Sequence, residues 1–192
     1  MSPTFRFLAS PHFNNRPEDE KITLLVVHAI SLPPHRFGGG YVDDLFLGRL
    51  DPTVDPFFKE IEGLRVSAHF LIDREGVVTQ YVPVFKRAWH AGVSSWKGRS
   101  GCNDFSVGIE LEGDEKTPFT DIQYACLTAL TRQLQSGLPD LDDEDITGHQ
   151  DIAPKRKWDP GPCFDWPRFR LALANCGESG SFSSGTWPIV WT

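Results

Sequence analysis

A short apolar run that ends in a histidine restricts the fold of this chain more than any other feature. Residues 24–27 read Leu-Leu-Val-Val and are followed by His28. An unbroken apolar run predicts a strand that is buried on both faces of a sheet, and the histidine would then face the rim of that sheet. Since clefts in such folds form at strand ends, His28 is a candidate for a functional group.

Three further runs predict strands beside the first one. With residues 23–27, the runs at 68–72, 77–82 and 107–111 are rich in Val, Ile, Leu and Phe. Residues 73–76 read Asp-Arg-Glu-Gly and predict a turn that joins two of these strands. We expect the four runs to form one central sheet.

Helical signals surround these runs. Residues 121–135 predict a helix, with Thr120 and Gln123 as a capping box, one face formed by Ile122, Cys126, Leu130 and Leu134, and Gly137 with Pro139 at its end. A second helix should begin after Asp165, and a short one is expected within 43–46 or 57–61. The predicted fold class is therefore α/β, a single domain with a central mixed sheet flanked by helices.

A proline-rich loop at residues 148–162 carries further candidate groups. It contains His149, Lys157 and Asp159, while prolines at 154, 160 and 162 restrict its backbone and stiffen it. His28, His149 and Asp159 would offer two nitrogens and one oxygen, a set that suits zinc and leaves a fourth position open for water. The residues alone leave an equal alternative, a satisfied core histidine and an aspartate that caps a turn.

Six ordered blocks carry a resemblance to a known family. They include the run 25–28, Arg-Val-Ser-Ala-His at 65–69, Arg-Ala-Trp-His-Ala-Gly at 87–92, Cys-Asn-Asp-Phe-Ser at 102–106 followed by 107–113, and the loop 148–162. Over residues 10–171 the chain resembles the AmpD-type 1,6-anhydro-N-acetylmuramoyl-L-alanine amidases. These are zinc enzymes of the peptidoglycan-recognition-like amidase superfamily.

The resemblance implies roles for the site residues. His28, His149 and Asp159 match the zinc ligands, and one Zn²⁺ per chain is expected as cofactor. Glu110 and Lys157 match the catalytic pair, the first as proton acceptor and the second as a charge that stabilises the oxyanion. Without the resemblance, a structural carboxylate and a solvated lysine would be the preferred interpretations.

Other matching positions imply contacts to substrate. Arg65 matches a residue that holds a substrate carboxylate, a task that suits a planar guanidinium. Trp89 is a candidate for stacking on sugar or peptide, and core packing is an equal alternative for it. Ala153 would offer backbone groups to the peptide, and His90 belongs to a typical block of the family.

The chain departs from the family pattern at three positions. Ala29 stands where many relatives have Asn, Gly101 where some have a second Arg, and Trp158 where a Thr is usual. None of these departures removes a ligand or a catalytic group. Because Ala29 and Gly101 lack polar side chains, we expect them to change how the substrate is held, with Ala29 among the substrate-binding positions.

Composition limits the partners. With 192 residues, 40% of them hydrophobic, the chain is long enough for one core, and we expect one amidase domain at 1–176. A net charge of −7 disfavours nucleic acid and anionic membranes as partners, because a protein needs a basic surface to bind either of them. The expected partner is a small anhydromuropeptide, and the expected state is a monomer. The N-terminus lacks a signal-peptide pattern and the four cysteines lack metal spacing, which favours the cytoplasm.

Two segments stand apart from the predicted core. Residues 33–56 form a long irregular region that could cover the cleft, and its glycines at 38–40 lack the Lys-Ser/Thr pair of a phosphate loop. Residues 177–192 are Gly- and Ser-rich before a Trp-Pro-Ile-Val-Trp sequence, which predicts a flexible tail. The two tryptophans of the tail could dock on the domain or on a second subunit.

The predicted function is zinc-dependent hydrolysis of the amide between the lactyl group of 1,6-anhydro-N-acetylmuramic acid and the L-Ala of its peptide, during cytoplasmic peptidoglycan recycling. One alternative is an amidase that acts on ordinary muropeptides or wall fragments. Another is a muropeptide-binding module without catalysis, which the complete ligand set disfavours. A structural zinc protein is disfavoured because three ligands leave the fourth position open.

Overall fold

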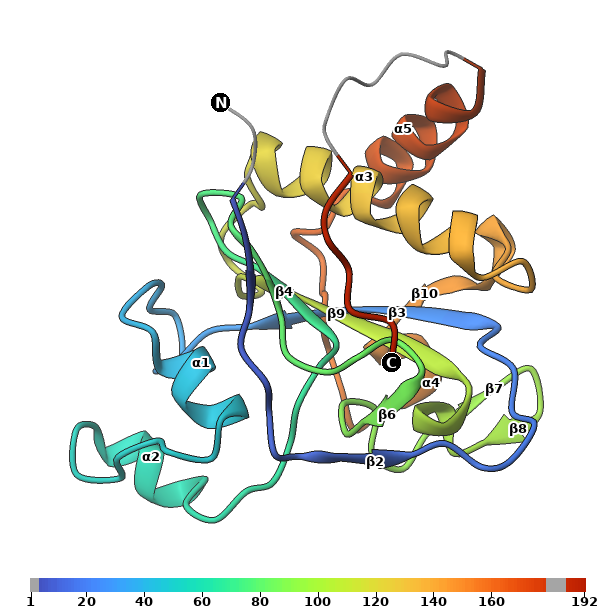
Figure 1. Cartoon of the computed structure of the whole chain (residues 1–192). Helices are drawn as coiled ribbons and strands as arrows, with labels where there is room; N and C mark the ends of the chain where they lie inside the picture. The colour runs from blue at the N-terminus through green and yellow to red at the C-terminus, as the bar shows by residue number, and fades with distance from the viewer. Residues whose placement is uncertain (1–3, 179–185) are drawn as a thin grey trace.

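A six-stranded mixed sheet forms the centre of the molecule in a computed structural model that describes residues 4–178 and 186–192 (Figure 1). The strands follow the order β1-β5-β4-β9-β3-β10 across the sheet. Their bounds are Phe5–Phe7 for β1, Leu24–Ile30 for β3, Phe70–Ile72 for β4, Val78–Gln80 for β5, Ser106–Glu112 for β9 and Ile146–Gly148 for β10. Strands β4 and β5 pair antiparallel, and the other neighbours pair parallel.

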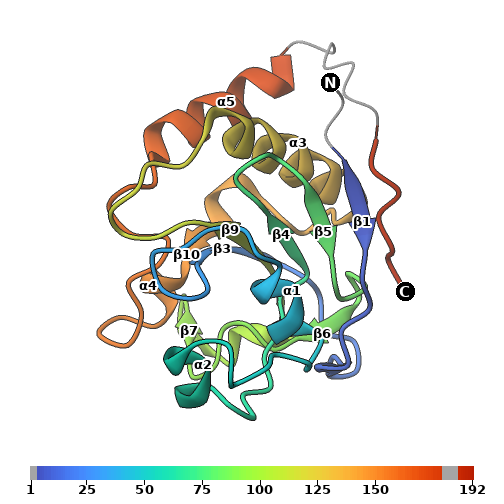
Figure 2. The same ribbon diagram turned by 90° about the vertical axis from the view of Figure 1, so that its left-hand side faces the viewer.

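Alternating side chains on β3 and β9 reach opposite layers of the fold. Leu25 and Val27 on β3, with Ile109 on β9, belong to the largest apolar core. That core is closed by α3, which spans Asp121–Gly137, and by α5, which spans Trp166–Glu178. Both helices cover the same face of the sheet in Figures 1 and 2. Both strands are therefore buried on both faces, as the apolar run predicts.

The other face of the sheet carries short elements and loops. Helices α1 at Tyr41–Phe46 and α2 at Pro56–Glu60 close a second apolar core there, and Figure 2 shows both below the sheet. Two small antiparallel pairs join β2 at Phe13–Asn15 with β6 at Lys86–Ala88, and β7 at Ser95–Trp96 with β8 at Arg99–Ser100. The short helices η1, η2 and α4 span Cys102–Asp104, Asp143–Asp145 and His149–Ile152.

Most elements expected from the sequence are confirmed. The four apolar runs form β3, β4, β5 and β9, and the expected turn joins β4 to β5. Helix α3 begins at the Thr120 capping box and ends at Gly137. The short edge strands β1 and β10 were not expected, because each has three residues and is held by its neighbour's backbone. On α3, Ile122 lies near Gly76 at the margin of the core and stays 38% exposed.

The end of the chain differs from the expected flexible tail. Trp187 and Ile189 are buried in the main core. The Gln133 side chain donates to the Trp187 carbonyl at 2.6 Å and accepts from its N–H at 3.0 Å, and Gln80 accepts from the Val190 N–H at 2.8 Å. These amides supply the hydrogen bonds that an adjacent strand would otherwise give. Residues 179–185 of the predicted tail lie outside the described residues, and α5 continues to Glu178, past the expected boundary at 176.

Candidate metal centre

Three predicted ligands come together from three separate parts of the chain. His28 lies on β3, His149 begins α4, and Asp159 lies in the proline-rich loop. The Nδ1 atoms of the two histidines are 2.9 Å apart, and the Asp159 Oδ2 atom lies 3.2 Å from Nδ1 of His28 and 3.1 Å from Nδ1 of His149. All three side chains are buried. One small ion could therefore contact the three ligand atoms at once.

Strand pairing explains how these distant residues meet. Strand β10 runs parallel to β3 with Gly148 opposite Val27, so the next residues, His149 at the start of α4 and His28 on β3, lie at the same rim. The Gln150 N–H donates to the Asp159 carbonyl at 2.8 Å and ties the loop to the start of α4. The loop thus holds Asp159 against both histidines.

The hydrogen bond at Nε2 of His149 shows which of its two ring nitrogens is available to bind a metal. Its Nε2 lies 3.1 Å from the backbone carbonyl of Ala91, which can only accept a hydrogen bond. In the neutral ring the proton therefore sits on Nε2, and Nδ1 directs its lone pair at the Asp159 carboxylate. Two acceptors at this distance need a proton or a cation between them. Two nitrogens and one carboxylate oxygen form a donor set that fits zinc.

Glu110 lies directly beside His28 in the sheet. Strands β3 and β9 pair these two residues in register, and Oε1 of Glu110 is 3.9 Å from Nδ1 of His28. Burial, and then the nearby charge of Asp159, raise the pKa of Glu110 well above its usual value, while Lys157 acts in the opposite direction. The Oε2 atom of Glu110 is buried, and it has no hydrogen-bond partner among the described residues. A carboxylate with a free oxygen and a raised pKa is suited to accept a proton.

A cleft of about 450 Å³ opens onto these groups. Its walls include predicted catalytic, metal and substrate-binding residues, namely Ala29, Trp89, His90, Glu110, His149, Lys157 and Asp159. Lys157 is exposed in the cleft, and its charge reaches both Glu110 and His28. The cleft can hold a small polar molecule with one end beside the three ligands.

The structure does not bring Arg65 or Ala153 into this cleft. Arg65 is exposed and borders a neighbouring hollow of about 150 Å³, whereas Leu64 and Val66 on either side of it line the cleft. Ala153 is buried in a core, and its N–H and carbonyl are bonded to His149 and to the backbone of Arg156 and Lys157. Neither residue lines the cleft, and the substrate-binding roles predicted for both stay predictions.

Trp89 and His90 border the cleft in different ways. The Trp89 indole N–H donates to Oδ1 of Asn14 at 2.8 Å, its ring stacks on His12, and the residue is half-buried at the cleft wall. Both nitrogens of His90 have partners inside the protein, His28 and Ser106. His90 therefore has no free nitrogen for a substrate in this arrangement, and its substrate-binding role stays a prediction.

Several lining residues were missed by the sequence analysis. The apolar wall comes from Phe46, Phe57 and Ile61, in or next to the short helices α1 and α2. His35, which the sequence offered no reason to select, also lines the cleft and lies 2.9 Å from Oδ2 of Asp114. No pattern in the sequence marks these residues, because loops between distant strands bring them together.

The three departures from the family pattern lie in different places. Ala29 and Trp158 line the cleft, and Trp158 is 45% exposed there. Gly101 caps the start of η1 with a φ of +75°, a conformation that favours glycine, and it is not among the residues that line the cleft. A direct effect on substrate is thus supported by position for Ala29 and Trp158.

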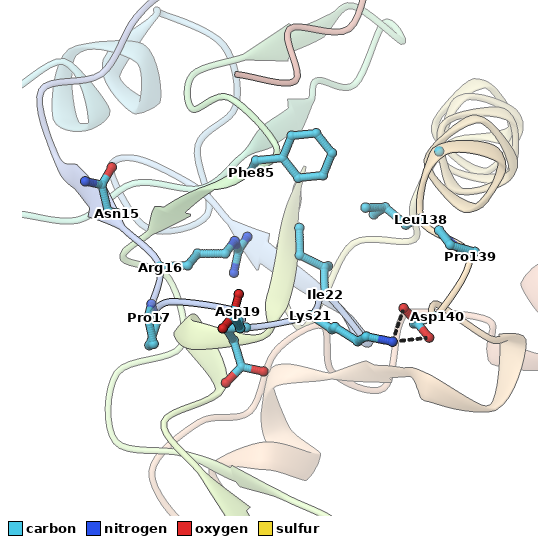
Figure 3. A pocket seen from close by; sticks show the side chains of 12 residues that line it. Asn15, Arg16, Pro17, Asp19, Lys21, Ile22, Phe85, Leu138, Pro139 and Asp140 are labelled. Carbon is cyan, nitrogen blue, oxygen red and sulfur yellow. Dashed lines mark hydrogen bonds and ion pairs between the residues drawn. The ribbon is translucent and has the colours of Figure 1, made fainter.

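A second cavity of about 400 Å³ lies away from the metal ligands (Figure 3). It is bordered by residues 15–17 and 19–22, by Phe85, and by residues 137–140 at the end of α3, and two of these residues, Lys21 and Asp140, form an ion pair. Arg16 borders this cavity, but its guanidinium is bonded to four backbone carbonyls, those of Val84, Asn103, Asp104 and Ser106. Arg16 therefore fastens loops together, and none of the predicted site residues lies here.

Comparisons with known proteins agree with this geometry. Residues 18–162 match the family model described as N-acetylmuramoyl-L-alanine amidase. The chain is 59% identical over 169 residues to the 1,6-anhydro-N-acetylmuramyl-L-alanine amidase AmpD of Escherichia coli K12, covering 88% of this chain and 92% of that protein. It is 35% identical over 155 residues to the amidase AmiD of the same organism, covering 71% of this chain and 52% of that protein.

Solved structures show the same fold. A crystal structure of a selenomethionine AmpD derivative superposes with a TM-score of 0.86 at 54% identity, over 90% of this chain and 96% of that one. A complex of E. coli AmiD with the substrate anhydro-N-acetylmuramic acid-L-Ala-D-γ-Glu-L-Lys superposes with a TM-score of 0.58 at 28% identity, over 82% of this chain and 60% of that one. The predicted α/β fold with a central mixed sheet is confirmed.

Proposed function

Because this chain belongs to the N-acetylmuramoyl-L-alanine amidase family, we propose that it hydrolyses the amide between the lactyl group of 1,6-anhydro-N-acetylmuramic acid and the L-Ala of the attached peptide. The observation that carries the proposal is the coincidence of two findings. The chain matches AmpD amidases over most of both lengths, and its His-His-Asp cluster lies beside a buried glutamate at the end of a cleft.

One zinc ion per chain is the proposed cofactor, held by His28, His149 and Asp159. When bound in such a site, zinc polarises a carbonyl group and lowers the pKa of a water molecule toward neutral pH. A cluster with three protein ligands also leaves room for a small fourth ligand, as catalytic sites require.

Two residues of the chain would handle the proton and the charge of the reaction. The Glu110 carboxylate, with its free oxygen, would accept a proton from the attacking water and then deliver it to the nitrogen of the departing L-Ala. The Lys157 ammonium, exposed in the same cleft, would face the carbonyl oxygen as negative charge develops on it. Trp89, Ala29 and the apolar wall would hold the sugar and peptide in place.

We place this reaction in cytoplasmic peptidoglycan recycling, the role suggested by the similarity to AmpD. None of the helices in the described part of the chain has the length and hydropathy needed to cross a membrane. The proposed substrate is a small molecule, and the proposed working unit is a monomer, because all of the predicted metal and catalytic residues come from one chain.

Mass spectrometry of a defined substrate tests the function. An anhydro-N-acetylmuramoyl tripeptide is incubated with the protein as purified, after chelator treatment, and after zinc is restored. The expected products are the free sugar acid and an intact tripeptide, lost on chelation and regained with zinc. A muropeptide without the anhydro bridge is tested in parallel, and faster cleavage of it would replace the proposed specificity. Binding without cleavage of either compound would identify a non-catalytic module.

A further inference from the structure

We propose that His90 is a positioning residue that fixes the tautomer and ring orientation of the zinc ligand His28, through a hydrogen-bonded chain that ends on the backbone carbonyl of Cys102. The proposal rests on the zinc site of the proposed function. It assigns to His90 a role different from the substrate contact that the sequence predicts.

The chain of hydrogen bonds is continuous from the ligand to the backbone. Nε2 of His28 lies 2.9 Å from Nδ1 of His90, and Nε2 of His90 lies 3.2 Å from Oγ of Ser106. The Ser106 hydroxyl donates to the Cys102 carbonyl at 2.6 Å. His28, Ser106 and Cys102 are fully or almost fully buried, and His90 is half-buried at the wall of the cleft.

The direction of every bond follows from the last one. A carbonyl only accepts, so the single hydroxyl proton of Ser106 points at Cys102, and Oγ must accept from Nε2 of His90. With its proton on Nε2, a neutral His90 has a lone pair on Nδ1 and accepts from Nε2 of His28. That leaves the lone pair of His28 on Nδ1, the atom that faces His149 and Asp159.

The tautomers of both histidine ligands are therefore fixed by backbone carbonyls that lie outside the metal site. Ala91 accepts from His149 directly, and Cys102 acts on His28 through Ser106 and His90. Metal-bound histidines commonly donate their other N–H to an outer partner, which fixes the tautomer and orients the ring. In this chain a neutral imidazole takes that place for His28, so no second negative charge is added next to Glu110 and Asp159.

The sheet leaves a space for His90 at Gly108. A Cβ added at Gly108 would lie 2.5 Å from Cγ of His90, a distance that real Cβ atoms essentially never show. The backbone N–H groups of His90 and Ala91 both donate to Oδ1 of Asn103, at 3.1 and 2.8 Å, which fixes the segment that carries the ring. The position of His90 is thus determined by its contacts with Gly108 and by the hydrogen bonds to Asn103.

Zinc affinity of folded variants tests the proposal. The dissociation constant is measured by competition with a chromophoric chelator, and the visible spectrum of the cobalt-loaded protein reports the coordination geometry. His90→Phe keeps a planar ring but removes the acceptor, and His90→Asn restores an acceptor close to the place of Nδ1. We expect His90→Phe to bind zinc about 10- to 100-fold more weakly, with an altered cobalt spectrum, and His90→Asn to recover much of the affinity.

A second pair of variants covers the case in which His90→Phe does not fold. Ser106→Ala removes the hydroxyl that orders the chain and leaves the ring in place, so it should also weaken zinc binding. Thr131→Val is the matched control, because the Thr131 side chain is fully buried and its hydroxyl has no partner among the described residues. Zinc affinity of this control should equal that of the unmodified protein.

The outcomes separate the proposal from the function on which it rests. If the unmodified protein does not bind zinc, the proposed metal site is wrong and this role of His90 falls with it. If the unmodified protein binds zinc and folded His90→Phe or Ser106→Ala binds equally well, only the positioning role is overturned. If His90→Phe and His90→Asn weaken zinc binding equally, the positioning role is also overturned. The loss of affinity would then result from the changed shape of the side chain and not from the missing hydrogen-bond acceptor.

Discussion

Replacing Glu110 by glutamine should reduce catalysis and, at the same time, leave the fold as stable or more stable. Glutamine has nearly the same shape as glutamate, so the buried position on β9 is refilled without a cavity. It cannot accept the proton of the attacking water, and loss of a general base typically costs about 10²- to 10⁴-fold in rate. We expect kcat to fall by that factor, with little change in KM.

The stability effect follows from the raised pKa of Glu110. A carboxyl group whose pKa is higher in the folded protein than in the unfolded chain makes folding less favourable at pH values above the unfolded pKa. Burial is the largest cause, and one carboxylate oxygen has no partner among the described residues. Glutamine removes the buried charge, so the zinc-free variant at pH 7 should melt at the same temperature as the unmodified protein or higher.

The assay combines steady-state hydrolysis of the anhydromuropeptide with thermal melting of the zinc-free protein. Glu112→Gln is the matched control, since Glu112 is a buried carboxylate on the same strand and accepts from backbone N–H groups of Gly38 and Arg74. The control should lose stability and keep its activity. A Glu110→Gln protein that turns over at the normal rate, or that melts well below the unmodified protein, would refute the reasoning.

Three further changes have defined outcomes. Lys157→Met should lower kcat by about 10²- to 10³-fold with zinc affinity preserved, and a change confined to KM would count against its role on the oxyanion. Trp187→Ala should lower the free energy of unfolding by about 3–5 kcal/mol, because Trp187 is buried in the main core, whereas an unchanged melting temperature would show that the C-terminal segment is not docked in solution. Burial, and then Arg16, lower the pKa of His69 to about 3, so its contribution to stability is complete above the unfolded pKa near 6.5 and is lost as the pH falls toward 3, at about 1.4 kcal/mol per pH unit. A melting temperature that stays constant from pH 7 to pH 4.5 would contradict this.

Local patterns in the sequence predicted much of the fold. The unbroken apolar run before His28 indicated that β3 is buried on both faces, and the apolar residues at 107–111 indicated a second strand, β9. The capping box at Thr120 placed the start of α3 at the correct residue. Such signals are local, so they need no knowledge of the partner elements. The short strands β1 and β10 lack them, since backbone pairing with a longer neighbour holds each of them in place.

For the site, the sequence supplied the chemical types, and the resemblance supplied their roles. The pattern of His28, His149 and Asp159 was compatible with zinc or with ordinary packing, and residues alone did not separate the two. The structure brings the three ligand atoms together, because the pairing of β10 with β3 joins segments more than a hundred positions apart.

By itself, then, the sequence determined which side chains could bind a metal and which segments were apolar enough to form the sheet. The tertiary structure alone decided that His90 turns both nitrogens to His28 and Ser106, that Arg65 stays outside the cleft, and that Trp187 lies in the core. The physical reason is that a hydrogen-bond partner or a buried surface comes from residues distant in the chain. Their spacing in the sequence does not encode how close they come once the sheet forms.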